Sequence, residues 1–506
     1  MAVKRQSLLF FTNPEWGQAN VILATIHEFL VVDDYDIHLA SYASLQPRLH
    51  GLFSIHAEAY PRPLVIAFSR VQDGFKSGDD AERPSITFHT IPGLSTAEAC
   101  YRDGIQGLLP HKPGLKGAVS SYRRLQDFFF HMTGEEYMEQ ERYAKDIITQ
   151  VQPAVIIAEQ GLSQALDACY ELKRPFVILS PNSFKDFEQL LQPRLGVLWK
   201  YPALASAFPF PVPGYLVPAN LYLWVRMSIT IASASCDESS RLHKINNVRH
   251  ACGLWGPPPV MSAFRVASRI ICPSLPELDF PMRVRPTTFG CGPIALPKRP
   301  VSEIDPHMDS WLRRKGMKTL LVNLGTHHTM DSMHALEIAR ALEQILDRVS
   351  DLQVLWKIVL TDDGQQKEIE EVFGLEMFLN QRIRLERWLR ADPVALLDTG
   401  KVIAQVHHGG ANTYFECCRS GVPQVILASW WDTYEYAARV EYLGVGVFAN
   451  KKSAPRAETK ELREAILNVM MNPEVSAKAN ELALVCQQNG EGRVRARDLI
   501  VDILRT

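Results

Sequence analysis

Residues 402–450 read VIAQVHHGGANTYFECCRSGVPQVILASWWDTYEYAARVEYLGVGVFAN, and this stretch decides the fold. Val402–Val406 is a short, largely apolar run with β-branched residues at three of its five positions, which predicts a buried strand. The two glycines of His407-His408-Gly409-Gly410 follow directly. They allow a tight turn that brings the backbone close to a ligand.

A short helix and a second strand follow this turn. Asn412 is a suitable N-cap for a helix that continues to Ser420 and ends at Gly421. Pro423–Leu427 then predicts another buried strand. Strand, glycine turn, helix and strand form a βαβ unit, and the N-terminus of its helix is an anion site.

The polar side chains of this unit have the spacing that a nucleotide sugar requires. His408, the amide of Asn412, the hydroxyl of Thr413 and the backbone N–H groups of the turn can hold a diphosphate. Glu416 lies one helical turn further on, where a carboxylate is favourable if it accepts hydrogen bonds from a vicinal diol such as a ribose. Asp432 follows the next strand, at the edge where open α/β sheets bind ligands, and can accept hydrogen bonds from hexose hydroxyls. The alternative is a structural turn with a capped helix.

This pattern resembles the donor-binding signature of family 1 glycosyltransferases, the nucleotide-sugar-dependent enzymes of the GT-B fold. The signature runs W, P-Q, H-x-G-x-N-S-x-x-E, G-V-P and D-Q. Its counterparts here are Trp388, His408, Gly410, Asn412, Thr413, Glu416, Gly421-Val422-Pro423 and Asp432. The segments HHGGAN and WWDTYEYA are most similar to fungal members that act on secondary metabolites.

The resemblance implies a role for each matching residue. Trp388 would stack on the uracil of a UDP sugar, and the residues of the glycine turn and Glu416 would hold the diphosphate and the ribose. Two positions depart from the signature. Arg390-Ala391 replaces the Pro-Gln pair, so a base contact is lost or supplied differently, and Thr433 replaces the Gln that follows the Asp, which leaves the transferred sugar open.

Strands and helices alternate along the whole chain, which predicts an α/β fold with parallel, doubly wound sheets. The resemblance implies the GT-B arrangement, in which two Rossmann-like domains face a cleft. The predicted strands are Leu8–Phe11, Asp36–Ala40, Ser85–His89, Val155–Ala158, Phe176–Leu179, Ser268–Cys272, Thr319–Leu324, Gln353–Val359 and Ile383–Leu385. The predicted helices between the early strands are Asn20–Leu30 and Ser163–Leu172, and Ser268–Cys272 is expected to be the last strand of the first half.

A proline-rich linker at residues 293–315 divides the chain. We expect an acceptor-binding domain at residues 1–292 and a nucleotide-sugar-binding domain at residues 316–490. Residues 491–506 predict an amphipathic helix, and the resemblance implies that it packs back on the first domain. Gly325-Thr326, directly after a predicted strand, opens a turn that suggests a second phosphate contact.

Composition excludes several classes of protein. The chain has 506 residues, enough for two domains, and its 46% apolar and 22% charged content is typical of a soluble globular protein. The net charge of −2 gives no electrostatic footprint for nucleic acid or an anionic membrane. Nine scattered cysteines without a CxxC pair favour reduced thiols over a disulfide framework or a zinc site. We expect a cytoplasmic protein without a signal peptide or a membrane span.

The acceptor is expected to be a small lipophilic molecule with a hydroxyl group, such as a terpenoid or a polyketide. Pro202–Pro218 is rich in proline and aromatic residues, and Ala219–Ser235 predicts a moderately apolar helix. We interpret them as the wall of an apolar substrate cleft, with a domain-packing helix as the alternative. One Arg and no Lys make this helix a poor membrane-surface helix.

The expected reaction needs no metal and no cofactor besides the UDP sugar as co-substrate. The helix dipole and the histidine of the glycine turn can stabilise the leaving diphosphate. The acidic pairs Asp33-Asp34, Asp79-Asp80 and Asp362-Asp363 stand in charged loop segments and are interpreted as solvated surface.

The sequence offers more than one candidate for the general base. Relatives commonly place a His after the glycine of the first strand–helix turn, but here Gln18 follows Gly17, and Gln cannot take a proton. Glu15 and Glu159 are the carboxylate candidates, because a Glu whose pKa is raised by burial can serve as a base. His89, at the end of a predicted strand, is a further candidate. A capping or packing role is the alternative for each.

Three other functions are alternatives to an inverting glycosyltransferase. A nucleotide-sugar 2-epimerase has the same fold but needs no acceptor cleft, which the aromatic segment at residues 202–227 disfavours. A non-catalytic sugar-nucleotide-binding protein is compatible with Gln18. A dinucleotide-dependent oxidoreductase is disfavoured, because Gly444-Val445-Gly446 lacks a third glycine and follows a helix.

Overall fold

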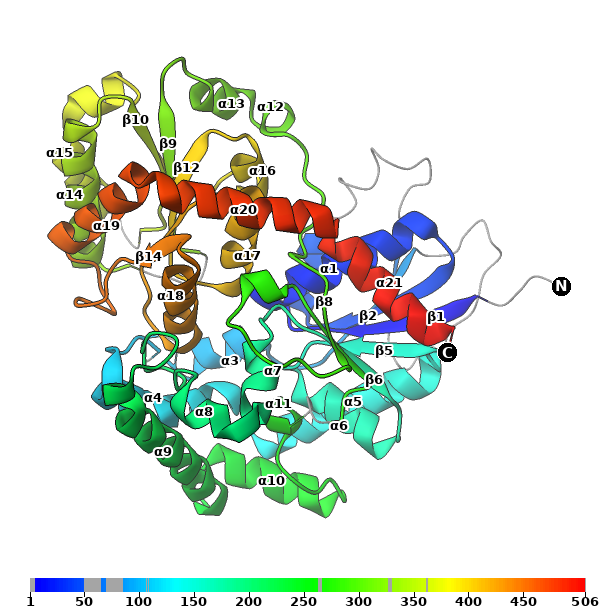
Figure 1. Ribbon diagram of the computed structural model, residues 1–506. Coiled ribbons are helices and arrows are strands. Elements are labelled where there is room, and N and C mark those ends of the chain that lie inside the picture. The colour runs from blue at the N-terminus through cyan, green and yellow to red at the C-terminus, as the bar shows by residue number, and fades with distance from the viewer. Residues whose placement is uncertain are drawn as a thin grey trace.

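The computed structural model describes residues 5–49, 65–69, 85–105, 107, 109–262, 266–325, 330–360 and 363–505. Within these ranges the strands form two separate sheets, and every strand pair is parallel (Figure 1). The predicted α/β class with doubly wound parallel sheets is confirmed.

The first sheet has the strand order β3-β4-β2-β1-β5-β6-β7-β8. Its strands are β1 (Gln6–Phe11), β2 (Tyr35–Ser41), β3 (Ile66–Ser69), β4 (Ile86–Thr90), β5 (Val155–Ala158), β6 (Phe176–Leu179), β7 (Arg269–Cys272) and β8 (Thr288–Gly290). The second sheet has the order β11-β10-β9-β12-β13-β14. Its strands are β9 (Lys318–Asn323), β10 (Leu352–Lys357), β11 (Ile383–Glu386), β12 (Val402–His407), β13 (Gln424–Ile426) and β14 (Gly446–Phe448).

Helices lie between many of the successive strands in the described parts of both halves. Those of the first half are α1 (Trp16–Val32), α3 (Thr96–Arg102), α4 (Gly114–Phe129), α5 (Gly134–Val151), α6 (Ser163–Glu171), α7 (Lys185–Glu188), α8 (Gly196–Trp199), α9 (Val217–Cys236), α10 (Arg241–Ala251) and α11 (Pro259–Ser262). Those that follow are α12 (Val301–Ile304), α13 (Pro306–Leu312), α14 (Ser332–Arg348), α15 (Asp363–Leu379), α16 (Pro393–Asp398), α17 (Ala411–Ser420), α18 (Trp431–Leu443), α19 (Thr459–Met471), α20 (Pro473–Asn489) and α21 (Gly492–Leu504).

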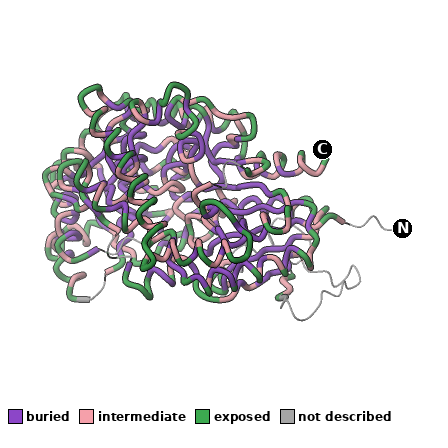
Figure 2. The backbone as a smooth tube through the Cα atoms, turned by 90° about the horizontal axis from the view of Figure 1, so that it is seen from below, coloured by how far each residue is buried: buried purple, intermediate pink, exposed green. Residues whose placement is uncertain are grey.

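The strands are continuous apolar runs because helices cover both faces of each sheet. In β1, Leu8 and Phe10 pack towards α1 and α21, whereas Leu9 and Phe11 pack towards α5 and α6. Figure 2 shows the result as a buried interior with exposed residues at the periphery. Among the described residues, no helix combines the length and the apolar character that a membrane span requires.

The C-terminal helix lies against the first half of the chain. In Figure 1, α20 runs from the second sheet towards the first, and α21 continues along α1. Ala496 and Ile500 of α21 are buried in the same hydrophobic cluster as Leu8, and Arg493 forms a 2.7 Å ion pair with Glu28 of α1. These contacts fix the end of the chain on the first sheet.

The two halves also meet through buried polar contacts between α18 and the first half. Lys185 forms an ion pair with Glu435, and the two residues are 0% and 6% exposed. Arg439 forms an ion pair of 3.1 Å with Asp279 and donates a 2.9 Å hydrogen bond to the hydroxyl of Ser183. Charged side chains are rarely buried unless they are paired, so these contacts make α18 part of the interface.

Several predicted boundaries are wrong. Ser268–Cys272 is not the last strand of its sheet, because β8 follows it; β8 is short and ends in Gly290, where an added Cβ would lie 2.4 Å from the carbonyl oxygen of Ser274. The proline-rich linker at residues 293–315 contains two short helices, α12 and α13, whose Val301 and Trp311 are buried against the second half. The first helix starts at Trp16 rather than Asn20.

The acidic pairs are only partly described. Asp33 is half exposed and forms a 3.0 Å ion pair with Arg5, and Asp34 is exposed. Asp79, Asp80 and Asp362 lie outside the described residues.

Candidate active site

In each sheet the strand order reverses at one point, and open α/β sheets bind ligands outside the carboxyl ends of the strands there. In the second sheet that point lies between β9 and β12. Gly325 follows β9, and the glycine turn with His408 follows β12. In the first sheet the point lies between β1 and β5, which are followed by Asn13 and Glu159.

The imidazole of His408 is packed between two glycines. A Cβ added to Gly325 would lie 2.9 Å from Cε1 of His408, and one added to Gly410 would lie 2.5 Å from its Nε2. Gly325 also has a φ of +87°, which other residues rarely adopt. The close approach therefore requires glycine at both positions. Thr326, the predicted second phosphate contact, lies outside the described residues.

Helix α17 starts two residues earlier than an N-cap at Asn412 predicts. Gly410 is its N-cap, with the N–H of Tyr414 donating to the Gly410 carbonyl at 3.0 Å, so the prediction of Asn412 as N-cap is wrong. Within the described part of the chain, no side chain caps this helix end. The N–H groups of its first turn are therefore available to an anion. Thr413 lies in this turn and is partly exposed.

The position of the helix start leaves the Asn412 side chain with a different partner. Its Nδ2 donates a hydrogen bond of 3.4 Å to the backbone carbonyl of Trp16, in the turn after β1. The predicted diphosphate turn of the second sheet thus touches the first strand–helix turn of the first sheet.

Glu416 lies one turn further along α17 and is partly exposed. Burial raises its pKa to about 8, and the negative charge of Asp392 adds to the effect. Lys298 and Arg419 oppose this shift. A carboxyl group in this state favours hydroxyl partners such as those of a ribose over a nearby phosphate.

Trp388 is 56% exposed and contacts residues from both halves. Its ring centroid lies 6.1 Å from that of Trp16, and the guanidinium of Arg48 lies 3.9 Å from the Trp16 ring centroid. Lys357 Nζ lies 4.8 Å from the ring centroid of Trp388. The four side chains make a cation–aromatic series across the two sheets.

Lys357 was not predicted from the sequence as a site residue. It ends β10, is 8% exposed, and its Nζ donates a 3.3 Å hydrogen bond to the carbonyl of Gly325. Among the described residues it has no carboxylate in ion-pair distance, and burial lowers its pKa. The buried cation therefore lies beside the glycine that contacts His408.

Asp432 and Thr433 lie in the first turn of α18. Burial raises the pKa of Asp432 to about 7, with a further contribution from Glu435. Thr433 is 1% exposed, and its hydroxyl accepts hydrogen bonds of 3.1 Å from the N–H groups of Ser429 and Trp430. The Thr433 hydroxyl is used to cap the helix, so the structure offers the side chain of Asp432 rather than that of Thr433 to a ligand.

Glu159 is held by hydrogen bonds at the point where the strand order of the first sheet reverses. It is 1% exposed, accepts a hydrogen bond from Nδ2 of Asn13, and accepts another of 2.8 Å from the N–H of Gly161. Burial raises its pKa to about 7. Because both oxygens are occupied and the side chain is enclosed, its geometry is that of a positioning group.

Glu15 is the N-cap residue of α1 and lies in the same turn as Trp16. Its Oε1 accepts a 2.8 Å hydrogen bond from the N–H of Ala97, whereas Oε2 is buried and makes no hydrogen bond with the described residues. Burial raises the pKa of Glu15, against the lowering effects of Ala97 and Ser95. Gln18 is partly exposed in the first turn of α1, with its N–H bound to the Glu15 carbonyl at 3.1 Å.

His89 is not placed to act as a base. It is 1% exposed, and its Nε2 lies 3.0 Å from Nδ1 of His38 in the neighbouring strand β2. Burial lowers its pKa to about 3. A neutral imidazole stacked inside the sheet on a second imidazole has no access to substrate, so the structure does not support this candidate.

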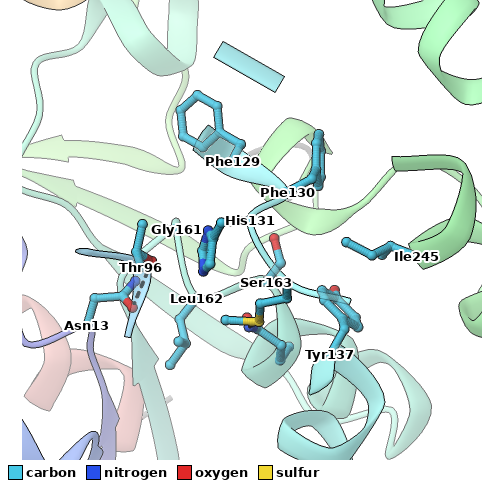
Figure 3. Close-up of a pocket in the computed structure, with 12 residues that line it drawn as sticks. Asn13, Thr96, Phe129, Phe130, His131, Tyr137, Gly161, Leu162, Ser163 and Ile245 are labelled. Atoms are coloured by element: carbon cyan, nitrogen blue, oxygen red, sulfur yellow. Dashed lines mark hydrogen bonds between the residues drawn. The ribbon is translucent and has the colours of Figure 1, made fainter. Parts of the chain in front are cut away.

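A small pocket lies at the carboxyl ends of β1 and β5, next to Asn13 (Figure 3). Figure 3 shows the hydrogen bond from Thr96 to Asn13 on one side of the pocket, and Phe129, Phe130 and Tyr137 on the others. Its volume of about 10 Å³ holds roughly one water molecule, so in this form the pocket is too small for an acceptor.

His131 lines this pocket and is 5% exposed. Its Nδ1 lies 2.9 Å from the carbonyl of Phe128, which assigns the ring proton to Nδ1. Its Nε2 is buried without a hydrogen-bond partner among the described residues, and burial lowers the pKa of the ring. A neutral imidazole in this state can accept a proton or a hydrogen bond from a hydroxyl group.

Comparison with known proteins agrees with this geometry. Residues 343–488 match the family model described as erythromycin biosynthesis protein CIII-like, C-terminal domain. The chain is 34% identical to the glycosyltransferase sdnJ of Sordaria araneosa over 535 aligned positions, which cover 99% of each chain.

Solved structures share the fold at low sequence identity. The kitacinnamycin glycotransferase has a TM-score of 0.64 at 15% identity, with 99% of this chain and 100% of that chain covered. UGT71G1 of Medicago truncatula, complexed with UDP-glucose, has a TM-score of 0.61 at 15% identity, with 99% of this chain and 98% of that chain covered. With two parallel sheets, a full-length relative and these neighbours, the chain belongs to the family 1 glycosyltransferases of the GT-B fold.

Proposed function

We propose that the enzyme is an inverting transferase that moves a hexose, glucose in the first instance, from a UDP sugar to a hydroxyl of a small lipophilic acceptor such as a terpenoid or a polyketide. The observation that carries the proposal is the contact of Asn412 with Trp16. It brings the diphosphate turn of one sheet against the turn that holds Glu15 in the other. The relative sdnJ is named a glycosyltransferase, which supports glycosyl transfer, and the UDP-glucose bound by UGT71G1 supports the choice of donor.

The donor is assigned to the second sheet. Trp388 stacks on the uracil, and Glu416 accepts hydrogen bonds from the ribose. His408 and the free N–H groups at the start of α17 hold the diphosphate. Asp432 accepts hydrogen bonds from the sugar hydroxyls. The domain limits that we infer are residues 1–292, 293–315, 316–490 and 491–506, as expected from the sequence.

The reaction needs a base and a stabilised leaving group. The acceptor hydroxyl gives its proton to Glu15 as its oxygen bonds to the anomeric carbon, on the face opposite the diphosphate. The bond between that carbon and the phosphate oxygen breaks, and UDP takes the bonding electron pair. The helix dipole of α17 and His408 stabilise the charge on UDP. These groups complete the reaction without a metal or a further cofactor.

Two features favour Glu15 over the other candidates. Its Oε2 is the carboxylate oxygen without a hydrogen bond among the described residues, whereas both oxygens of Glu159 are bound. Glu15 is also adjacent in sequence to Trp16, which contacts the donor-side residues Asn412 and Trp388. His131 in the neighbouring pocket is the second candidate.

The test is acceptor-dependent release of UDP. The enzyme is incubated with UDP-glucose, with and without a panel of terpenoid and polyketide alcohols, and UDP and glucoside are measured by mass spectrometry. A transferase forms both products only with an acceptor. An epimerase changes the sugar without an acceptor, and a binding protein changes nothing, so either result rejects the proposal.

The nine cysteines are all free, and most are buried. Free thiols fit a reducing compartment, and we place the enzyme in the cytoplasm.

A further inference from the structure

Helix α9 presents an apolar stripe to solvent. Leu221, Tyr222, Val225 and Ile229 recur at helical spacing and are between 43% and 48% exposed. Tyr215, directly before the helix, is 80% exposed. Monomeric soluble proteins rarely expose a contiguous apolar surface without a use for it.

This stripe is not the packing face of the helix. Leu223 and Trp224 point to the opposite side, where they are buried in a cluster with Tyr122 of α4 and Trp431 of α18. The inner face packs in a cluster that includes Trp431 of the second half, which fits the alternative interpretation of α9 as a domain-packing helix. Among the described residues, none of the four side chains of the outer stripe belongs to a hydrophobic cluster.

Neighbouring elements extend the apolar surface. Helix α8 packs against α9, and Leu195 and Trp199 at its ends are 67% and 47% exposed. Helix α4 packs on the other side of α9, and its Leu115 is 39% exposed. Figure 1 shows α4, α8 and α9 together at the edge of the first half. We refer to these three helices, with Tyr215, as the α9 surface.

The α9 surface is basic, although the whole chain has a net charge of −2. Residues 104–129 and 189–236, which include all three helices, together contain seven Lys and Arg residues and one acidic residue, Asp127 of α4. The cations are Lys112, Lys116, Arg123, Arg124, Arg194, Lys200 and Arg226. Helix α9 alone has one cation, which made it a poor membrane-surface helix on sequence grounds, but the fold places the cations of α4 beside it.

We propose that the α9 surface docks on an anionic lipid surface. Exposed Leu, Tyr, Trp and Ile side chains between basic residues are the combination that enters the interface of an anionic bilayer. A second copy of the chain is disfavoured as the occupant, because two basic surfaces repel each other. Docking here would place the lipid on the outer face of α9, whose inner face packs in the cluster with Trp224 and Trp431. If the proposed function holds, a lipophilic acceptor can then enter from the bilayer.

Co-sedimentation with vesicles tests the proposal. The full-length enzyme is mixed with phosphatidylcholine vesicles that contain or lack phosphatidylserine. We expect binding to the phosphatidylserine vesicles, and about a fivefold loss of affinity for each cation removed in Lys116→Gln and Arg123→Gln. Leu221→Ser combined with Ile229→Ser should lower the affinity at least about tenfold.

Matched controls lie on the far half of the molecule. Leu484→Ser on α20, where Leu484 is 55% exposed, and Lys460→Gln on α19 should bind vesicles like the wild type. Vesicle binding that is absent in the wild type, or lowered equally by the controls, overturns the proposal. So does a wild type that sediments as a dimer without lipid and becomes monomeric in the α9 variant. Transfer of glucose to a water-soluble phenol is measured in parallel, because it tests the proposed function without the lipid.

Discussion

The side-chain amide of Asn412 donates a hydrogen bond of 3.4 Å to the backbone carbonyl of Trp16, and this contact joins the ligand-binding edges of the two sheets. Glu15 precedes Trp16, and the N-terminus of α17 surrounds Asn412. In the proposed mechanism, the contact brings the turn of Glu15, the proposed base, against the helix end that is proposed to stabilise the leaving diphosphate. Because the two groups of residues follow strands of different sheets, we expect some substitutions here to change donor affinity and others to change kcat.

Replacement of Glu15 should affect chemistry more than donor binding. Glu15→Gln is expected to lower kcat by about 10²–10⁴ with little change in UDP affinity, since general-base catalysis contributes that much. Burial raises the pKa of Glu15, and only the ionised form accepts a proton, so kcat of the wild type should rise with pH through this pKa. Steady-state kinetics across pH, together with calorimetry of UDP, measure both effects.

Two further variants show whether another residue is the general base. Glu159→Gln keeps an acceptor for Asn13 and should retain more activity than Glu15→Gln, and His131→Asn tests the pocket imidazole. Full kcat in Glu15→Gln with a large loss in either of the others would transfer the base to that residue. The conservative exchange Gln18→His should keep activity.

Replacement of His408 or Glu416 should weaken UDP binding. His408→Ala removes a hydrogen bond to the diphosphate, and Glu416→Ala removes one to the ribose, so each should cost about 1–3 kcal/mol of binding free energy. Isothermal calorimetry on folded protein measures this. UDP affinity that is unchanged in both variants refutes the assignment of the donor site.

Lys357 should contact the anionic part of the donor. It is a buried cation beside Gly325 and Trp388, without a carboxylate partner among the described residues. Lys357→Met should weaken UDP binding about tenfold or more, because a charge-assisted hydrogen bond contributes about 1.5–3 kcal/mol. Uridine, which lacks phosphate, should bind the variant and the wild type alike.

Lys318 at the opposite end of the second sheet is the matched control. It is exposed and pairs with Asp351 at 2.8 Å, so Lys318→Met should leave the UDP affinity unchanged. An equal loss of uridine and UDP affinity in Lys357→Met would show that Lys357 contributes to binding of the uridine part of the donor and not of its phosphates.

The glycine turn and the apolar strands could be predicted because their signals are local. The short runs before His408 and Glu159 are buried on both faces, and such strands have a composition that does not depend on the rest of the chain. The N-cap of α17 was missed by two residues, since glycine in an extended conformation replaced the expected Asn412. Helix boundaries depend on such single-residue choices.

The roles of Lys357, Trp16 and His131 depend on contacts between distant segments. Trp16 starts the helix after β1 of the first sheet, whereas Trp388 follows β11 of the second sheet. His131 enters its pocket from the loop between α4 and α5. The sequence does carry a weak signal for Lys357, a charged residue at the carboxyl end of the apolar run VLWK. Nothing local distinguishes His131 from other histidines, and His89 fits the local pattern yet is buried against His38.

The buried ion pair between Lys185 and Glu435 should hold the two halves together. The two side chains are 0% and 6% exposed, so Lys185→Met leaves a buried charge on Glu435 without its partner. We expect a loss of about 3–5 kcal/mol in the free energy of unfolding, measured with urea. The double exchange of Lys185→Met and Glu435→Met should recover most of this loss. A double variant as unstable as Lys185→Met would show that the pair has a role beyond charge compensation.

Glu159 should make the enzyme less stable as pH rises. Burial raises its pKa from 4.5 to about 7, so between these values the folded protein retains a proton that the unfolded chain releases. The unfolded state then binds fewer protons, and the free energy of unfolding falls with pH across this window. Buried neutral histidines such as His407, whose pKa is lowered to about 4, act in the opposite direction below their ordinary pKa.

The difference between the wild type and Glu159→Gln cancels the histidine contribution. In urea unfolding from about pH 5 to pH 8, the stability of Glu159→Gln relative to the wild type should increase, and a constant difference would show that Glu159 is already ionised in the folded enzyme at low pH.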